Sequence, residues 1–154
     1  MITVSKEFQW AMAHMLDGHE GLCQNLHGHE YKLIVTVTSK DADINDKRRI
    51  PAPVIGMVVD FKELKSVVNR LIVNKLDHTL MLNGYTKDAF EQGLINLADE
   101  CHKKHEVVDY RPTAENMVQD FAEQLQEAFE PTRIRLVRLR LYETPTSYAE
   151  WEDK

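Results

Sequence analysis

The sequence predicts an α+β fold in which two helices cover one face of a four-stranded antiparallel sheet. Two N-terminal runs alternate apolar and polar residues as strands do, and two later segments repeat apolar residues at helical spacing. Two further strand-like runs close the chain. A length of 154 residues, 43% of them hydrophobic, suits a single domain over residues 1–154 with its own core.

The first two strands are predicted at residues 2–14 and 27–38, paired as an antiparallel hairpin across residues 15–26. That pairing places the end of the first strand beside the start of the second. The apolar positions that define the shared face are Ile2, Val4, Phe8, Trp10 and Met12 in the first run, and Tyr31, Leu33, Val35 and Val37 in the second.

Helical spacing occurs in two segments, from Asp60 to about Lys75 and from Thr113 to Pro131. Asp60 and Thr113 are of the residue types that cap helix N-termini, and Glu115 complements the helix dipole. Pro131 ends the second helix. The apolar stripes consist of Leu64, Val67, Val68, Leu71 and Ile72, and of Met117, Val118, Phe121, Ala122, Leu125 and Phe129.

Strands are also predicted at residues 133–142 and 147–151, on either side of a turn at 144–146. In the first of these, Val137, Leu139 and Leu141 share one face, and Glu143 is the next residue of that parity. Residues 39–53 are expected to form an exposed connection. Residues 84–110 are expected to form a short helix or an irregular insertion.

The composition favours a cytoplasmic protein, and the edges of the predicted sheet favour self-association. A net charge of −6 argues against binding to nucleic acid or to an anionic membrane. No apolar run approaches the ~20 residues of a membrane span, and the N-terminus has the pattern of a strand instead of a signal peptide. Cys23 and Cys101 are expected to be free thiols in a reducing compartment. Open sheet edges favour pairing with another subunit.

Three histidines fall on the apolar face where the predicted hairpin strands meet. His27 and His29 are two residues apart, so on an extended backbone both rings leave one face, with Cα atoms about 6.5 to 7 Å apart. His14 ends the first strand with matching parity. Three neutral imidazoles form a catalytic type of zinc site with an open position. The alternative is that they only close a hydrophobic face, with Gly28 relaxing the turn.

Cys23, Asp77, His78 and Glu143 are further candidates, each with an ordinary structural alternative. Cys23 could be a base or nucleophile, a fourth zinc ligand, or an inert loop residue. Asp77 could orient His78 as a proton shuttle, or His78 could simply face the dipole at a helix C-terminus. The Glu143 carboxylate could bind a planar pair of N–H groups, or merely end a strand.

Together these residues resemble the family of 6-pyruvoyltetrahydropterin and 6-carboxytetrahydropterin synthases. The motifs that carry the resemblance are His14, Cys23 with His27-Gly28-His29, Asp60-Phe61, Asp77-His78, Pro112-Thr113-Ala114-Glu115-Asn116 and Glu143-Thr144-Pro145. It spans most of the chain outside residues 40–53 and 84–110; the latter segment is long beside the compact family members. Three residues separate Cys23 from His27, which is similar to the bacterial enzymes of the queuosine pathway.

The resemblance implies a tunnelling fold, in which subunits join their sheets into a barrel and form a hexamer with active sites between subunits. It implies conversion of 7,8-dihydroneopterin triphosphate to 6-carboxy-5,6,7,8-tetrahydropterin, with release of triphosphate and acetaldehyde. The nearest alternative is a pyruvoyl synthase, which only eliminates triphosphate. A non-catalytic, zinc-stabilised oligomeric module is the alternative from another class.

The resemblance also implies a role for each candidate residue. Cys23 would be the base that abstracts a proton, and His78 with Asp77 would relay protons. Glu143 would anchor the pterin ring. The full assignment is His14, His27 and His29 for zinc; Cys23, Asp77, His78 and Glu143 for catalysis; and Thr113, Glu115 and Glu143 for substrate.

Overall fold

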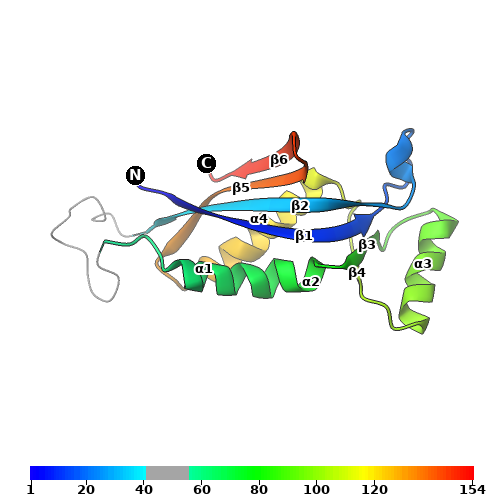
Figure 1. Cartoon of the computed structure of the whole chain (residues 1–154), viewed down its shortest axis with the longest axis horizontal. Helices are drawn as coiled ribbons and strands as arrows, with labels where there is room; N and C mark the ends of the chain where they lie inside the picture. The colour runs from blue at the N-terminus through cyan, green and yellow to red at the C-terminus, as the bar shows by residue number, and fades with distance from the viewer. Residues whose placement is uncertain (41–55) are drawn as a thin grey trace.

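Six strands form a mixed sheet in the spatial order β4-β3-β1-β2-β5-β6 (Figure 1). The structure, a computed structural model, describes residues 1–40 and 56–154. The strands are β1 (Val4–His14), β2 (His27–Ser39), β3 (Thr79–Asn83), β4 (His105–Val108), β5 (Ile134–Thr144) and β6 (Ser147–Glu152). Most of the connection predicted at residues 39–53 lies outside the described residues.

The main helices are α1 (Phe61–Val68), α3 (Ala89–Glu100) and α4 (Ala114–Phe129). Helix α1 continues through a π-helical segment, Asn69–Val73, into the short helix α2 (Asn74–Leu76). As predicted, Asp60 and Thr113 cap α1 and α4, with side chains that accept from the backbone N–H groups of Lys62 and Asn116. No helix in the described part of the chain is long and apolar enough to cross a membrane.

The α+β class is confirmed, but the sheet is larger than predicted and is not wholly antiparallel. Strand β3 pairs in parallel with β1, and β4 pairs in parallel with β3. Both strands are short, with five and four residues, and neither alternates clearly between apolar and polar positions. Periodicity therefore could not reveal them. The short helix predicted as one alternative for residues 84–110 is α3, which lies at the β4 edge of the sheet (Figure 1).

The predicted hairpin of β1 and β2 is present, and its register fixes which side chains share a face. His14 lies opposite His27, Met12 opposite His29, and Trp10 opposite Tyr31. Side chains alternate between the two faces of a strand, so this register places the three histidines on the same face as the buried aromatic rings. Trp10 and Tyr31 stack there with ring centroids 5.9 Å apart.

The core lies between this face of the sheet and the helices α1 and α4. Its members come from the sheet and from both helical segments: Phe8, Trp10, Tyr31, Leu33 and Val35 from the hairpin, Leu64, Val68 and Ile72 from the first helical segment, and Met117, Phe121 and Leu125 from α4. Burying these apolar side chains is the main contribution that holds the helices on the sheet.

The face predicted for β5 is correct only in its second half. Leu139 and Leu141 are buried, but Leu136 takes the buried position that parity assigned to Val137. The pairing with β2 shifts register at this point, from Thr36↔Arg138 to Val37↔Leu136. A bulge of this kind inserts an unpaired residue, which exchanges the two faces. Beyond the bulge the alternation is regular again, so Leu141 and Glu143 lie on the same face of the strand.

A buried carboxylate attaches α3 to β3. Glu91 is completely buried, and its Oε1 accepts a hydrogen bond of 2.8 Å from the backbone N–H of Asn83. The N–H of Glu91 in turn donates to Asp88 Oδ1, which caps the helix. The contact links the helix start to the strand end across the turn at residues 84–88.

Replacing Glu91 with alanine is expected to destabilise the protein by about 1–3 kcal/mol, because the Asn83 N–H loses its acceptor and a buried side chain is removed. Urea denaturation measures the change. Glu100→Ala, an exposed glutamate of the same helix, is the matched control. Equal midpoints for the two variants would show that the Glu91 contact does not hold α3 in place.

Candidate active site

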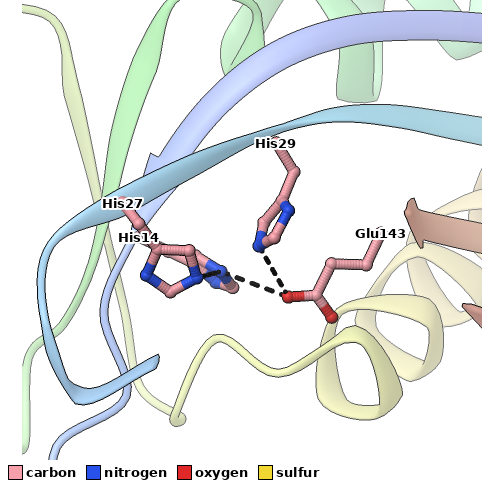
Figure 2. Close-up of side chains that lie close together, drawn as sticks. All are labelled: His14, His27, His29 and Glu143. Carbon is pink, nitrogen blue, oxygen red and sulfur yellow. Dashed lines mark hydrogen bonds and ion pairs between the residues drawn. The ribbon is translucent and has the colours of Figure 1, made fainter. Parts of the chain in front are cut away.

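Three imidazole rings meet where β1 ends and β2 begins (Figure 2). The Nε2 atoms of His14 and His27 are 3.2 Å apart. The ring of His29 lies 5.2 Å from that of His14 and 4.8 Å from that of His27, measured between centroids. His14 is completely buried, whereas the His29 side chain keeps 20% of its exposure. The hairpin register therefore brings together the three residues predicted to bind metal.

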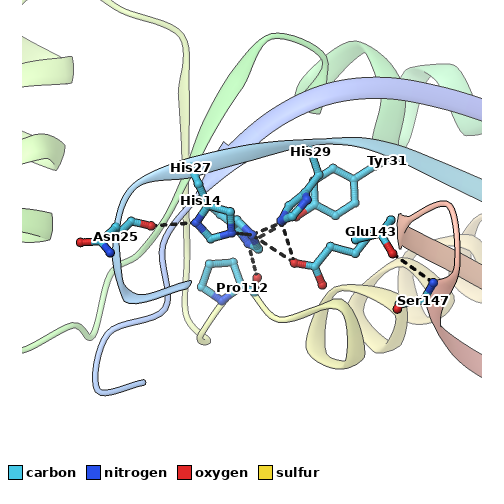
Figure 3. A network of polar contacts seen from close by, with 9 residues as sticks. His14, Asn25, His27, His29, Tyr31, Pro112, Glu143 and Ser147 are labelled. Atoms are coloured by element: carbon cyan, nitrogen blue, oxygen red, sulfur yellow. Dashed lines mark hydrogen bonds and ion pairs between the residues drawn. The ribbon is translucent and has the colours of Figure 1, made fainter. Parts of the chain in front are cut away.

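Backbone carbonyl groups orient two of the rings (Figure 3). His14 Nδ1 lies 2.8 Å from the Pro112 carbonyl oxygen, and His27 Nδ1 lies 2.7 Å from that of Asn25. A carbonyl oxygen can only accept, so in both rings Nδ1 carries the hydrogen and Nε2 presents its lone pair to the centre of the cluster. Donation by the outer ring nitrogen is the usual support of a metal-binding histidine.

The Glu143 carboxylate completes the cluster from the end of β5 (Figure 2). Its Oε1 lies 3.3 Å from His14 Nε2 and 3.0 Å from His29 Nε2. The ligand atoms of all four residues lie within 4.8 Å of one another, so the cluster could hold a metal ion. The sequence pattern placed Glu143 on the correct face, but it did not indicate that the carboxylate would reach the histidines.

One atom of the cluster is left without a hydrogen bond. His29 Nε2 is buried and has no hydrogen-bond partner among residues 1–40 and 56–154, although Glu143 Oε1 is only 3.0 Å away, because a short ion-pair distance alone does not satisfy hydrogen-bond geometry. A bound cation would satisfy this nitrogen. The donor set of neutral imidazole nitrogens and a carboxylate fits zinc and similar transition metals.

The electrostatics of the cluster keep His29 neutral and Glu143 ionised. Burial lowers the pKa of His29; the Glu143 carboxylate opposes this shift, and the two other histidines add to it. For Glu143, the adjacent His14 side chain is the main reason that its pKa is lowered, and burial acts in the opposite direction. Neutral imidazole and ionised carboxylate are the forms that bind metal.

A pocket of about 430 Å³ opens beside the cluster, between β2 and β5. Its lining includes His29, Glu143, Lys32, Tyr142 and Pro145. The Lys32 ammonium group lies 4.3 Å from the centre of the Tyr142 ring. The volume falls within the range of small-molecule sites.

Asp77 and His78 form a second group at the end of α2. Asp77 Oδ1 lies 2.9 Å from His78 Nδ1 and accepts a 3.2 Å hydrogen bond from the N–H of Ala11. Burial by itself would raise the pKa of Asp77, but the hydrogen bonds from His78 and Ala11, together with the positive charges of His78 and Lys104, outweigh it and the pKa is lowered. The side-chain contact that a proton shuttle requires is therefore formed, and the His78 ring, 81% exposed, is accessible.

Cys23 lies apart from both groups within one chain. It sits half-buried in a short 3-10 turn, Leu22–Gln24, and its carbonyl accepts from the N–H of Leu16. Its sulfur is not part of the four-residue cluster, which argues against the fourth-ligand alternative. Burial is the main cause of the raised pKa of Tyr31, and negative charge on Glu143 and on Cys23 adds to it. The Tyr31 hydroxyl is 3.3 Å from His14 Nε2.

The two weaker substrate candidates lie at the start of α4. The Thr113 hydroxyl accepts from the Asn116 N–H and so caps the helix, and Glu115 is exposed in its first turn. The residue just before them, Pro112, is the one whose backbone carbonyl contacts the cluster. Sequence analysis missed the Pro112 and Asn25 carbonyls because a backbone group has no signature in a residue pattern; Tyr31 was assigned only to the core.

Comparison with known proteins places the chain among pterin synthases. A family model described as 6-pyruvoyl tetrahydropterin synthase matches residues 3–154. The 6-carboxy-5,6,7,8-tetrahydropterin synthase of Haemophilus influenzae is 35% identical over 153 residues, which cover 99% of this chain and 100% of that protein. A protein of the same name from Rickettsia bellii is 29% identical, with 97% of this chain and 99% of that protein covered.

Solved structures show the same fold. An uncharacterized protein from Wolinella succinogenes superimposes with a TM-score of 0.79 at 23% identity, covering 99% of this chain and 98% of the other. The 6-pyruvoyl tetrahydropterin synthase of Plasmodium falciparum gives a TM-score of 0.67 at 20% identity, with 99% and 97% covered. The fold expected from the sequence resemblance is therefore confirmed.

Glu143→Gln tests whether the carboxylate is a metal ligand. Three imidazoles suffice for a catalytic type of site with an open position, so we expect the variant to keep its metal. His27→Ala is the comparison, because it removes a ligand. Loss of a group that only hydrogen-bonds to a ligand typically weakens metal binding by about 10–100-fold, so loss of the ligand itself should weaken it by roughly 100-fold or more. Metal titration of the chelator-treated proteins measures both. Equal loss in the two variants would make Glu143 a fourth ligand.

Proposed function

Because this chain belongs to the 6-pyruvoyl tetrahydropterin synthase family, we propose that it is a zinc-dependent 6-carboxy-5,6,7,8-tetrahydropterin synthase. In this proposal it converts 7,8-dihydroneopterin triphosphate to the carboxypterin, with release of acetaldehyde and triphosphate, as a step towards queuosine in the cytoplasm. The observation that carries the proposal is the cluster of His14, His27 and His29, in which a buried ring nitrogen has no hydrogen-bond partner in the part of the chain that the structure describes. The names of the curated relatives support the carboxy branch.

The metal centre would be held by the three imidazoles and supported by the carbonyls of Pro112 and Asn25. Zinc bound there would supply positive charge that stabilises negative charge developing on the substrate. The burial of His14 and the neutral state of His29 favour metal binding at neutral pH. The chain's own residues would carry out binding and proton transfer.

Glu143 would hold the pterin in the pocket between β2 and β5. Its lowered pKa keeps the carboxylate ionised, so its two oxygens can accept parallel hydrogen bonds from a ring N–H and an amino group. The same pocket is lined by His29. A substrate anchored on Glu143 would therefore extend its side chain towards the histidines.

Cys23 would abstract a proton, and His78, oriented by Asp77, would relay protons. No hydrogen bond or ion pair joins Cys23 to this pair in the described residues of one chain. Among the described residues no further strand pairs with β4 or β6, the two edge strands of the sheet, and open edges favour pairing with another subunit. Both observations support an assembly, which we propose to be a hexamer, with each active site completed by a neighbouring subunit.

Incubation with 7,8-dihydroneopterin triphosphate tests the reaction directly. We expect equal amounts of acetaldehyde, triphosphate and a product with the mass of 6-carboxytetrahydropterin, because the carboxy reaction breaks a carbon–carbon bond. Mass spectrometry and an aldehyde-coupled assay measure them. Triphosphate without acetaldehyde would identify a pyruvoyl synthase. An oligomer that binds metal but does not consume the substrate would identify a non-catalytic module.

Replacing Cys23 with alanine is expected to lower kcat by about 100-fold or more, the usual contribution of a general base, while zinc content and assembly stay unchanged. Cys101→Ala removes the other free thiol, which is exposed, and is the matched control. Steady-state kinetics, metal analysis and gel filtration provide the three readouts. Full activity of Cys23→Ala would refute its assignment as the base.

A further inference from the structure

The peptide group that joins Asp77 to His78 is held at both ends. Its N–H donates to the Ala11 carbonyl oxygen of β1 at 2.8 Å, and its C=O accepts from the Lys104 ammonium group at 2.6 Å. Lys104 also donates to the Asn74 carbonyl oxygen at 2.9 Å. The plane of this peptide cannot rotate without breaking one of these bonds.

The backbone conformation beyond this peptide is uncommon for a residue with a Cβ. His78 has a φ of 57°, in the left-handed region that residues with a Cβ rarely occupy. Such a conformation persists only where the surroundings impose it, and it is concentrated at functional sites. Here it accompanies the contact of 2.9 Å between His78 Nδ1 and Asp77 Oδ1.

Lys104 reaches this position because of the parallel pairing of β3 and β4. The pairing begins with Leu80 opposite His105, so the preceding residue, Lys104, lies next to the start of β3. Lys104 also lines a pocket of about 600 Å³ together with His78 and Ala11. It belongs to residues 84–110, the segment that is long beside the compact members of the family. None of the motifs that carry the family resemblance lies in this segment.

We propose that Lys104 is a positioning residue for the Asp77–His78 pair. Its ammonium group holds the Asp77 carbonyl, which keeps His78 in the left-handed conformation and its Nδ1 on the Asp77 carboxylate. The catalytic part of this proposal rests on the proposed function, in which that pair relays protons. A lysine that only caps the C-terminal carbonyls of α2 would instead contribute stability without affecting the His78 ring.

The test compares Lys104→Met, Lys104→Arg and the control Lys103→Met, which removes an adjacent exposed lysine, in the assembled protein. Ring ¹⁵N signals of labelled histidine, with His78 assigned by His78→Gln, report which ring nitrogen carries the hydrogen, and need no substrate. Steady-state kinetics and thermal unfolding follow on the same samples. Lys104→Gln takes the place of the methionine variant if the latter does not fold.

We expect the His78 ring of the wild type to carry its hydrogen on Nδ1. In Lys104→Met we expect a mixture of rings with the hydrogen on Nδ1 and rings with it on Nε2. We also expect kcat to fall about tenfold or more with KM within about twofold, because a misplaced catalytic group slows the reaction without weakening binding. Lys104→Arg should restore both readouts, and Lys103→Met should match the wild type.

An unchanged His78 ring in folded Lys104→Met, or an equal change in Lys103→Met, would overturn the proposal. A lower melting temperature with an unchanged ring would show that Lys104 is only a helix cap, which also overturns it. If the wild-type protein does not turn over the pterin, the proposed function fails, but the ring signals still decide whether Lys104 positions His78.

Discussion

The candidate site depends on the register between β1 and β2. His14 pairs with His27 and Met12 with His29, so all three imidazoles emerge on the buried face and at one end of the hairpin. A shift of one residue would turn the rings of one strand to the opposite face and separate the ligands. The stacked Trp10 and Tyr31 lie on the same face in the same register, so the packing of the core also fixes the geometry of the metal site.

The sequence predicted the elements in which apolar residues repeat regularly over many positions. The alternation through Trp10 and Tyr31 predicted both long strands and the convergence of the histidines, and the helical stripes predicted α1 and α4. The prediction failed where elements were short or the pairing was irregular. The four residues of β4 carry no usable period, and the bulge beside Val137 exchanged the faces of β5. The carbonyls of Asn25 and Pro112 have no sequence signal.

The parts that could not be predicted are those that position the second group of candidate residues. Strands β3 and β4 extend the sheet beyond β1 and bring Lys104 against the peptide of Asp77 and His78. The hairpin and this extension therefore have different roles. The first brings the histidines together through its register, and the second holds a strained histidine beside a carboxylate. Cys23 belongs to neither of them.

X-ray absorption spectroscopy of protein purified without chelator tests most directly whether the hairpin histidines bind a metal ion. The proposed function predicts a zinc edge, and the cluster predicts a first shell of nitrogen and oxygen atoms at about 2.0–2.1 Å, with no sulfur, because it contains imidazoles and a carboxylate but not Cys23. A sulfur shell at about 2.3 Å, or protein without any transition metal, would contradict it.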